Sequence, residues 1–289
     1  ARSFCAMKHV GLNVACDPLF TASYTGVNAG MVIAVADDPG MHSSQNEQDS
    51  RHHAQASKTM MLEPSDSAEC LAYTKLAYEL SEQFDTPVIL RLSTRVSHSR
   101  SLSETAERVD NGVKDYVKDP QKYVMMPAMA KGRHVVVEER FQAETASINT
   151  VEYNDTSIGV IAAGISYQYA KEALGDRVSY LKLGCVYPLP VELIKEFADK
   201  CDTVYVIEQL DDFIETHCRK IGVDVIGKEA FSFCGEYSQA MIAKAIFSEE
   251  KKSLQADVAI PGRPPVLCAG CPHRGLFYAL KKLKVTVSG

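Results

Sequence analysis

The feature that most constrains the fold of this chain is an uninterrupted apolar run at residues 31–36. A strand with one face in solvent alternates polar and apolar side chains, whereas this run is apolar throughout, as in a parallel strand covered on both faces. Shorter apolar runs at 60–62 and 87–92 predict two further strands. Because parallel strands need crossover connections, usually through helices, the sequence predicts an α/β fold with right-handed connections.

Residue patterns predict further helices and strands along the chain. Apolar spacing predicts one helix at about 12–24 and another that is capped by Ser65 or Asp66. The pattern weakens at 101–154, which we interpret as a connector, and its segment 134–141 fits either element by propensity, although we favour a helix. We expect a second α/β unit that ends near Ser248, with strands at 157–164, 178–183 and 203–208 and helices at 166–174 and 191–200.

Composition limits the class of protein. The chain has 289 residues, 46% hydrophobic and 24% charged, as in folded globular proteins, and its length suits two domains and part of a third. The 31 basic and 37 acidic residues give a net charge of −6, which argues against general nucleic-acid or anionic-membrane binding. No uncharged apolar segment reaches the roughly 18 residues of a membrane span. Nine cysteines, mostly single among apolar residues, predict a reduced, cytoplasmic protein.

Both ends of the sequence indicate a fragment of a longer polypeptide. The first residues contain no initiator methionine and no targeting pattern, and the last five resemble a strand that has just begun. Before them, residues 251–265 contain charges and three prolines, which is typical of a linker, and residues 267–284 predict a loop and one helix.

A polar segment at 37–53 follows the carboxyl end of the first buried strand, where open parallel sheets place their ligand sites. It almost lacks apolar side chains, so it is either a solvated loop or one wall of an active site. In the second interpretation its imidazole, hydroxyl and amide groups bind a ligand, and the candidates are His42, Ser43, Ser44, Gln45 and Asn46.

A second polar stretch, at 91–100, follows the strand at 87–92 and contains three arginines and one histidine among hydroxyl residues. A guanidinium fork suits the oxygens of a carboxylate or a phosphate, so this stretch is either an anion site or a polar connector that leaves the domain. Gly159 and Gly164 lack the G-x-G-x-x-G spacing, and we interpret them as turn residues rather than a dinucleotide site.

The third candidate is the C-x-x-C motif of Cys268 and Cys271, which continues into Pro272, His273 and Arg274. Two thiols at this spacing can bind a metal or an iron–sulfur cluster, or act as a redox dithiol. Such sites need about four ligands, and the chain has no second C-x-x-C motif. The alternatives are a tight glycine turn before the next helix, or an anion site at that helix's first amides.

Four separated segments, in the right order and together covering nearly the whole chain, resemble the alpha subunit of indolepyruvate ferredoxin oxidoreductase. They lie at 7–15, 36–51, 94–99 and 268–275. The family is similar to pyruvate ferredoxin oxidoreductases, which depend on thiamine diphosphate. The resemblance therefore implies parallel sheets flanked by helices, in a partial thiamine-diphosphate pyrimidine-type domain and a transketolase C-terminal-like domain.

The resemblance also implies domain limits. Residues 1–150 would be the partial pyrimidine-binding domain with its connector, 151–250 the transketolase C-terminal-like domain, and 251–289 a linker and the start of a diphosphate-binding domain. It places the family's activating glutamate before Ala1, and the Gly-Asp metal–diphosphate motif and the ferredoxin-type cysteines after Gly289.

The activity that the resemblance implies is oxidative decarboxylation of an aryl 2-oxo acid such as indolepyruvate. Thiamine diphosphate with Mg²⁺ would do the organic chemistry, 4Fe–4S clusters would pass electrons to ferredoxin, and coenzyme A would take the acyl group. A beta subunit and an oligomeric assembly are the implied partners. The main alternatives are a non-oxidative, transketolase-like thiamine enzyme, and a non-catalytic assembly fragment, since the isolated chain lacks the activating carboxylate and the metal motif.

Residue roles follow from the same resemblance. His42, Ser43, Ser44 and Gln45 would line the reaction chamber, and Arg95 or His98 would contact the substrate carboxylate or coenzyme A. The residues expected to bind cofactor are Gly40, Asn46, Gly270, His273 and Arg274. Cys268 and Cys271 would bind a cluster, although Pro272 and His273 depart from the commoner sequence that follows such cysteines.

Overall fold

The computed structural model describes residues 1–140, 145–251, 258–259, 261, 266–267 and 269–286. The chain divides into two compact units, Ala1–Lys251 and Lys252–Gly289. Both sheets belong to the first unit, and the described part of the second unit contains one helix, α12 (His273–Leu283). The single helix predicted at 267–284 is therefore confirmed.

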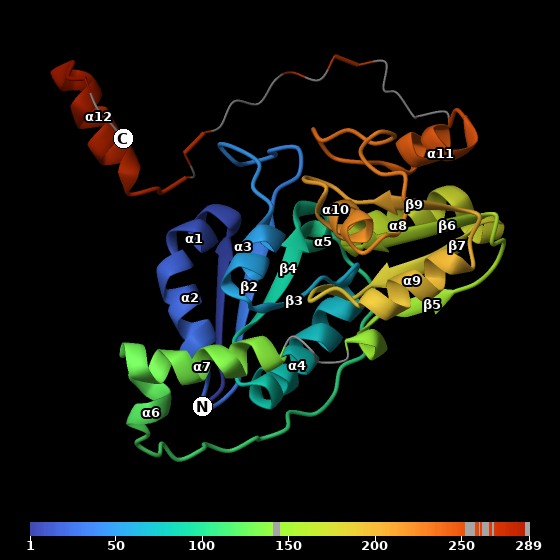
Figure 1. Cartoon of the computed structure of the whole chain (residues 1–289). Coiled ribbons are helices and arrows are strands. Elements are labelled where there is room, and N and C mark those ends of the chain that lie inside the picture. Colours follow the sequence, from blue (N-terminus) through green and yellow to red (C-terminus); the bar gives the residue numbers. More distant parts are fainter. Residues whose placement is uncertain (141–144, 252–257, 260, 262–265, 268, 287–289) are drawn as a thin grey trace. The chain divides into compact units, whose positions relative to one another are not determined.

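The first sheet is mainly parallel, as its apolar strands predict. Its strand order is β1-β2-β4-β3-β8, in which β1, β2, β4 and β3 run parallel to one another and β8 is antiparallel to β3. Figure 1 labels β2, β4 and β3 of this sheet. The strands are β1 (Ser3–Lys8), β2 (Met31–Asp37), β3 (Met60–Leu62), β4 (Val88–Ser93) and β8 (Cys185–Tyr187). The apolar run at 31–36 is β2, and it lies between two parallel neighbours.

Seven helices accompany this sheet among the described residues. They are α1 (His9–Val14), α2 (Cys16–Thr25), α3 (Ser50–Ser57), α4 (Ser67–Phe84), α5 (Thr94–His98), α6 (Pro120–Tyr123) and α7 (Pro127–Glu139). The single helix expected at 12–24 is wrong, because the chain forms two helices that break at Ala15. Pro18 explains the break, since it has no N–H and its ring would clash with the carbonyl four residues earlier in a continuous helix.

The region 101–154 begins as an exposed connector without helix or strand up to residue 118, and helices follow from Pro120. The helix favoured for 134–141 is confirmed as part of α7, which begins at Pro127 and packs against α2. Arg133 Nη2 donates to Asp85 Oδ2 at 2.7 Å and Lys122 Nζ to Asp85 Oδ1 at 2.8 Å, so one carboxylate fixes α6 and α7 to the end of α4. Residues 141–144 lie outside the described part of the chain.

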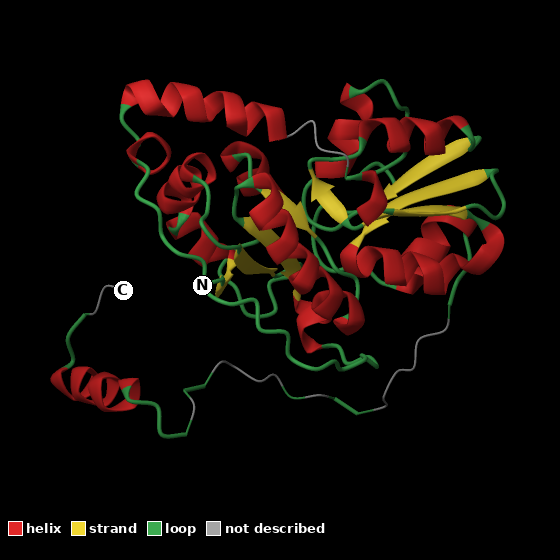
Figure 2. Cartoon of the chain, turned by 90° about the horizontal axis from the view of Figure 1, so that it is seen from below, coloured by secondary structure: helices red, strands yellow, loops and turns green. Residues whose placement is uncertain are grey.

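The second sheet has the order β5-β7-β6-β9, in which only β5 runs antiparallel to its neighbour. Helices cover both of its faces (Figure 2). Alternate residues of β6 enter different cores: Ile161 packs in one hydrophobic cluster and Val160 in the other. The elements are β5 (Thr150–Glu152), β6 (Ile158–Ala163), β7 (Ser179–Leu183), β9 (Thr203–Ile207), α8 (Gly164–Leu174), α9 (Val191–Asp199), α10 (Phe213–Lys220) and α11 (Gln239–Phe247), with short 3-10 turns at Ala146–Ile148 and Gly175–Arg177.

The two sheets are not independent. One hydrophobic cluster contains Ile33 and Ile89 of the first sheet together with Leu181 and Val206 of the second. Strand β8 follows β7 along the chain, yet it completes the first sheet. The domain limits at 150 and 250 stay a prediction. Among the described residues, no helix is both long enough and apolar enough to cross a bilayer.

Asp66 caps helix α4, as one of the two sequence alternatives predicts. Its Oδ1 accepts from the backbone N–H of Glu69 at 2.9 Å. Glu69 in turn accepts from the backbone N–H of Ser65 at 2.9 Å and pairs with Lys182 of β7. The start of α4 is thus also tied to the second sheet.

We predict that Asp66→Ala lowers the free energy of unfolding by about 1 kcal/mol, because the first turn of α4 loses its acceptor. Asp66→Asn keeps a side-chain oxygen at the cap and is the matched control. Urea denaturation of both variants checks this, and equal losses would contradict a capping role.

Candidate active site at the carboxyl ends of the strands

The two polar segments predicted as site walls lie side by side. Strands β2 and β4 are paired up to Asp37 and Ser93, so the loop after β2 and helix α5 leave the same edge of the sheet. Thr94 Oγ1 at the start of α5 donates to Asp38 Oδ1 in that loop at 2.6 Å. Neighbouring parallel strands thereby place His42 and Arg95, which are distant in sequence, in one region.

Asp38 organises the loop. Its carboxylate accepts from Ser44 Oγ at 2.6 Å and from the backbone N–H of Ser43 at 2.9 Å and of His42 at 3.2 Å. Lys8 Nζ, at the end of β1, lies 3.2 Å from Asp38 Oδ2 and donates to the Ser43 carbonyl at 2.6 Å. Three of the predicted chamber residues are therefore held by one buried carboxylate that is 3% exposed.

The ionised form of Asp38 is favoured. Burial raises the pKa of this carboxyl, but hydrogen bonds from Ser44, Thr94 and Ser43 outweigh burial and hold the pKa well below its usual range. The carboxylate is thus a fixed acceptor at neutral pH, and the Ser44 and Thr94 hydroxyl hydrogens point to it rather than to a ligand.

A second carboxylate, that of Glu236, contacts both Arg95 and His42. Arg95 forms a two-pronged ion pair with Glu236 through Nε and through Nη2, the latter 2.7 Å from Oε2. His42 Nε2 lies 3.4 Å from Glu236 Oε2, and the Tyr169 hydroxyl donates to Oε1 at 3.4 Å. The Arg95 hydrogen bonds hold the pKa of Glu236 below its usual value, so this cluster contains an ionised carboxylate.

The other predicted residues of these segments have different surroundings. The Gly40 N–H donates to Glu47 Oε1 at 2.6 Å, and its φ of +82° is a conformation that favours glycine. The Asn46 carbonyl lies 3.2 Å from His9 Nε2. Gln45 and His98 are exposed, and their side chains form no hydrogen bond or ion pair with a described residue. The structure thus brings His42, Ser43, Ser44 and Arg95 together, but not His98.

A buried network of ion pairs around Arg51 and Arg91 lies next to the site. Arg51, 1% exposed, donates through Nε and Nη2 to Asp49 at 2.9 and 2.5 Å and pairs through Nη1 with Glu208, which follows β9. Arg91 of β4 donates to Asp37 Oδ2 and lies within ion-pair distance of Glu63 Oε1, both at 2.7 Å. Burial raises the pKa of Asp49, but the two guanidinium groups outweigh it and hold that pKa below its usual value.

This network does not form a cofactor pocket. Glu63 Oε2 and Gln209 Nε2 are buried without a hydrogen-bond partner among the described residues, and both residues line a hollow of about 10 Å³. A hollow of this size admits one water molecule at most. The oxygens of Asp38 and Glu236 are already taken by protein donors. The buried network and the carboxylates of Asp38 and Glu236 therefore do not fit the anchor of a metal-bound diphosphate.

The C-x-x-C motif lies in the second unit, and its first cysteine, Cys268, lies outside the described residues. Gly270 has a φ of +76° in the turn before α12. The Arg274 N–H donates to the Cys271 carbonyl at 3.2 Å, and Cys271 Sγ lies 3.5 Å from His273 Nδ1. This geometry is that of a tight turn entering a helix, and a cluster role for the two cysteines stays a prediction.

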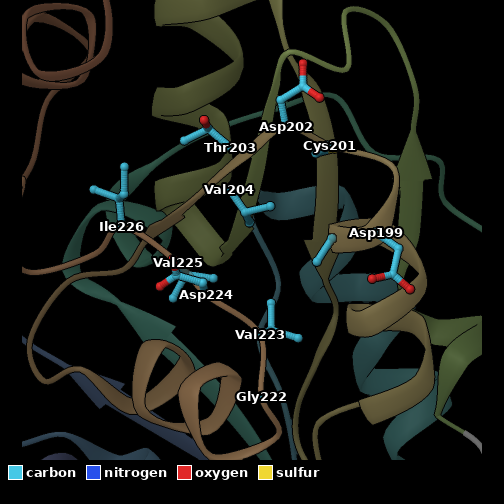
Figure 3. A pocket seen from close by; sticks show the side chains of 11 residues that line it. Asp199, Cys201, Asp202, Thr203, Val204, Gly222, Val223, Asp224, Val225 and Ile226 are labelled. Atoms are coloured by element: carbon cyan, nitrogen blue, oxygen red, sulfur yellow. The ribbon is translucent and has the colours of Figure 1, made fainter.

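A separate hollow of about 440 Å³ lies at the opposite end of β9 (Figure 3). It is lined by the end of α9, the start of β9 and residues 222–226, and Asp199, Asp202 and Asp224 are among its residues. None of the predicted site residues lines it. It is therefore not part of the polar site, which lies at the carboxyl ends of the strands.

The acidic partners of the site were not predicted from the sequence. Glu208 had a usable signal, because a carboxylate directly after a buried strand points to the ligand edge of the sheet. Asp38 lay inside the polar segment but was not singled out. Glu236 had no such signal, since it comes from a loop 141 residues after Arg95.

No protein-family model matches the chain, but curated relatives do. The indolepyruvate oxidoreductase subunit IorA of Methanothermobacter thermautotrophicus is 41% identical over 305 residues, which cover 97% of this chain and 49% of that subunit. The subunits of Archaeoglobus fulgidus and Pyrococcus horikoshii are 38% and 36% identical, covering 98% and 97% of this chain and 49% of each relative. The chain is a homologue of the IorA subunit. It spans about half the length of these curated relatives.

Solved structures share the fold of this IorA homologue. A 2-oxoglutarate:ferredoxin oxidoreductase from Magnetococcus marinus superposes with a TM-score of 0.65 at 15% identity, over 85% of this chain and 53% of that one. A transketolase from Campylobacter jejuni has a TM-score of 0.51 at 12% identity, over 85% and 35%. The predicted fold class, α/β with parallel sheets flanked by helices, is confirmed.

Replacing Arg51 of the IorA homologue with Met should lower the free energy of unfolding by about 3–5 kcal/mol, because Asp49 and Glu208 stay buried without their shared cation. Arg177→Met, which removes an exposed pair with Glu249, is the control and should change stability little. Chemical denaturation measures both. Similar losses in the two variants would show that burial adds nothing to the Arg51 pairing.

The lowered pKa of Asp38 predicts an acid-sensitive loop. Because this pKa is lower in the folded than in the unfolded chain, Asp38 stabilises the fold above its unfolded value of about 3.9, and the contribution is lost as pH falls below that value. Asp38→Asn should therefore show a shallower loss of stability between about pH 4 and 2. Unfolding free energies measured against pH test this, and parallel profiles would contradict it.

Proposed function

We propose that this chain is part of a 2-oxo acid oxidoreductase and forms one wall of its substrate chamber. The observation that carries the proposal is 36–41% identity to IorA subunits of indolepyruvate oxidoreductases over 97–98% of the chain. The polar site at the carboxyl ends of β2 and β4 supports it, because this is where α/β folds bind ligands.

The proposed substrate is an aryl 2-oxo acid such as indolepyruvate, which is oxidatively decarboxylated with coenzyme A while ferredoxin accepts the electrons. Arg95 is the residue that we assign to the substrate carboxylate, because its side chain is 53% exposed and presents a planar fork. His42 adds a second nitrogen beside it. Asp38 keeps the Ser43–Ser44 segment in place beneath them.

Other parts belong to the rest of the enzyme in this proposal. Thiamine diphosphate would supply the carbanion that attacks the 2-oxo group, and its Mg²⁺ anchor would come from segments outside this chain. The same holds for most of the 4Fe–4S clusters, the beta subunit and the oligomeric assembly. His273 and Arg274, at the exposed start of α12, remain our candidates for contact with the diphosphate.

The test uses the complete subunit assembled with its beta subunit. Indolepyruvate oxidation should require coenzyme A and reduce ferredoxin. Arg95→Ala should lower turnover about tenfold or more, since a charge-assisted contact to the carboxylate is lost. Arg100→Ala, an exposed arginine of the same stretch, is the matched control. Turnover without any electron acceptor would instead favour a non-oxidative enzyme, and unchanged kinetics of Arg95→Ala would remove Arg95 from the site.

A further inference from the structure

We infer that Glu236 occupies the binding place of the substrate carboxylate and is displaced from Arg95 when the 2-oxo acid enters. This inference rests on the proposed function, and it names Glu236 as a positioning residue that competes with the substrate. Glu236 lies in the loop between α10 and α11, on the second sheet's side of the molecule.

The donors around Glu236 form a carboxylate-binding set. Arg95 of α5 contributes two guanidinium nitrogens, His42 of the loop after β2 contributes Nε2, and Tyr169 of α8 contributes its hydroxyl. Three separate elements therefore converge on one carboxylate. A guanidinium fork with an imidazole and a hydroxyl is also what the carboxylate of a 2-oxo acid needs, because the two carboxylates have the same geometry and charge.

Exchange between the two carboxylates is inexpensive at this position. The side chains of Arg95 and His42 are 53% and 39% exposed, so a ligand in solvent can reach both while Glu236 is still bound. The exchange replaces one two-pronged carboxylate contact of Arg95 with another, so the guanidinium keeps a partner of the same charge and geometry when the substrate takes the place of Glu236. The buried pairs of Arg51 and Arg91 do not offer this exchange, because breaking them would leave unpaired charges inside the fold.

The backbone directly before Glu236 is open to its surroundings. Gly235 comes directly before it with a φ of +85°, and no atom lies within 4 Å of the position where a Cβ would stand. The glycine gives the backbone freedom next to the moving side chain. Once released, Glu236 stays ionised at neutral pH, so the exchange needs no proton transfer.

This arrangement predicts selectivity for free acids. Without substrate, Glu236 neutralises the charge of Arg95. A substrate ester or amide has no carboxylate and cannot replace Glu236. Only a ligand that brings its own negative charge can take over the Arg95 fork.

The deciding variant is Glu236→Gln in the complete enzyme. Two quantities are measured: KM for indolepyruvate, and the dissociation constant of 3-indolepropionate, which has the aryl group and the carboxylate but no ketone to react. Both should fall about threefold to fivefold, because the internal competitor has lost its charge, while kcat changes little. Glu172→Gln, which removes an exposed carboxylate of α8 close to Tyr169, is the control and should leave both values unchanged.

A purely structural role for Glu236 predicts the opposite: the dissociation constant would be unchanged or higher, and that result would overturn the inference. Arg95→Ala provides a second check, since adding Glu236→Gln to it should have no further effect on 3-indolepropionate binding. If the wild-type enzyme oxidises no 2-oxo acid, the proposed function fails. If it does so and Glu236→Gln does not tighten binding, only this inference fails.

Discussion

The buried pairing of Arg51 with Asp49 and Glu208 is the interaction on which the site depends. Asp49 is the last residue of the loop after β2, Arg51 lies in the first turn of α3, and Glu208 follows β9, so one guanidinium joins the end of the site loop to the second sheet. An ion left unpaired at this depth would cost several kcal/mol. The position of the site loop is therefore coupled to that of the second sheet.

The interactions of the site become more exposed with distance from this buried pairing. Asp38 is 3% exposed and holds His42, Ser43 and Ser44 through fixed hydrogen bonds, whereas the Arg95 side chain is 53% exposed and holds one exchangeable partner. Rigidity thus decreases from the buried network outward to the solvent. A binding site benefits from this order, because the groups that position the ligand are pre-organised and only the outermost contact must be exchanged.

The sequence predicts best what depends on local pattern. The apolar run of β2, the Asp66 cap and the two polar segments after β2 and β4 are all visible in contiguous residues. The Arg51–Glu208 contact joins residues 157 positions apart, and no spacing rule identifies such a pair. Strand β8 was missed for the same reason, since three residues that complete a distant sheet have no pattern of their own. The break between α1 and α2 was predictable in principle, because Pro18 is plain in the sequence.

Charge balance explains why the missed residues are acidic. The visible motifs offered cations and donors, namely Arg51, Arg91, Arg95 and the hydroxyls, because these suggest anion binding. A buried guanidinium left unpaired would cost several kcal/mol, so Arg51 and Arg91 need carboxylate partners, and Glu208 and Glu63 come to them from other parts of the fold. Two guanidinium groups are buried and their carboxylates are permanent. The third guanidinium, that of Arg95, is exposed. Among the carboxylates that pair with Arg51, Arg91 and Arg95, Glu236 is therefore the one that a substrate can replace.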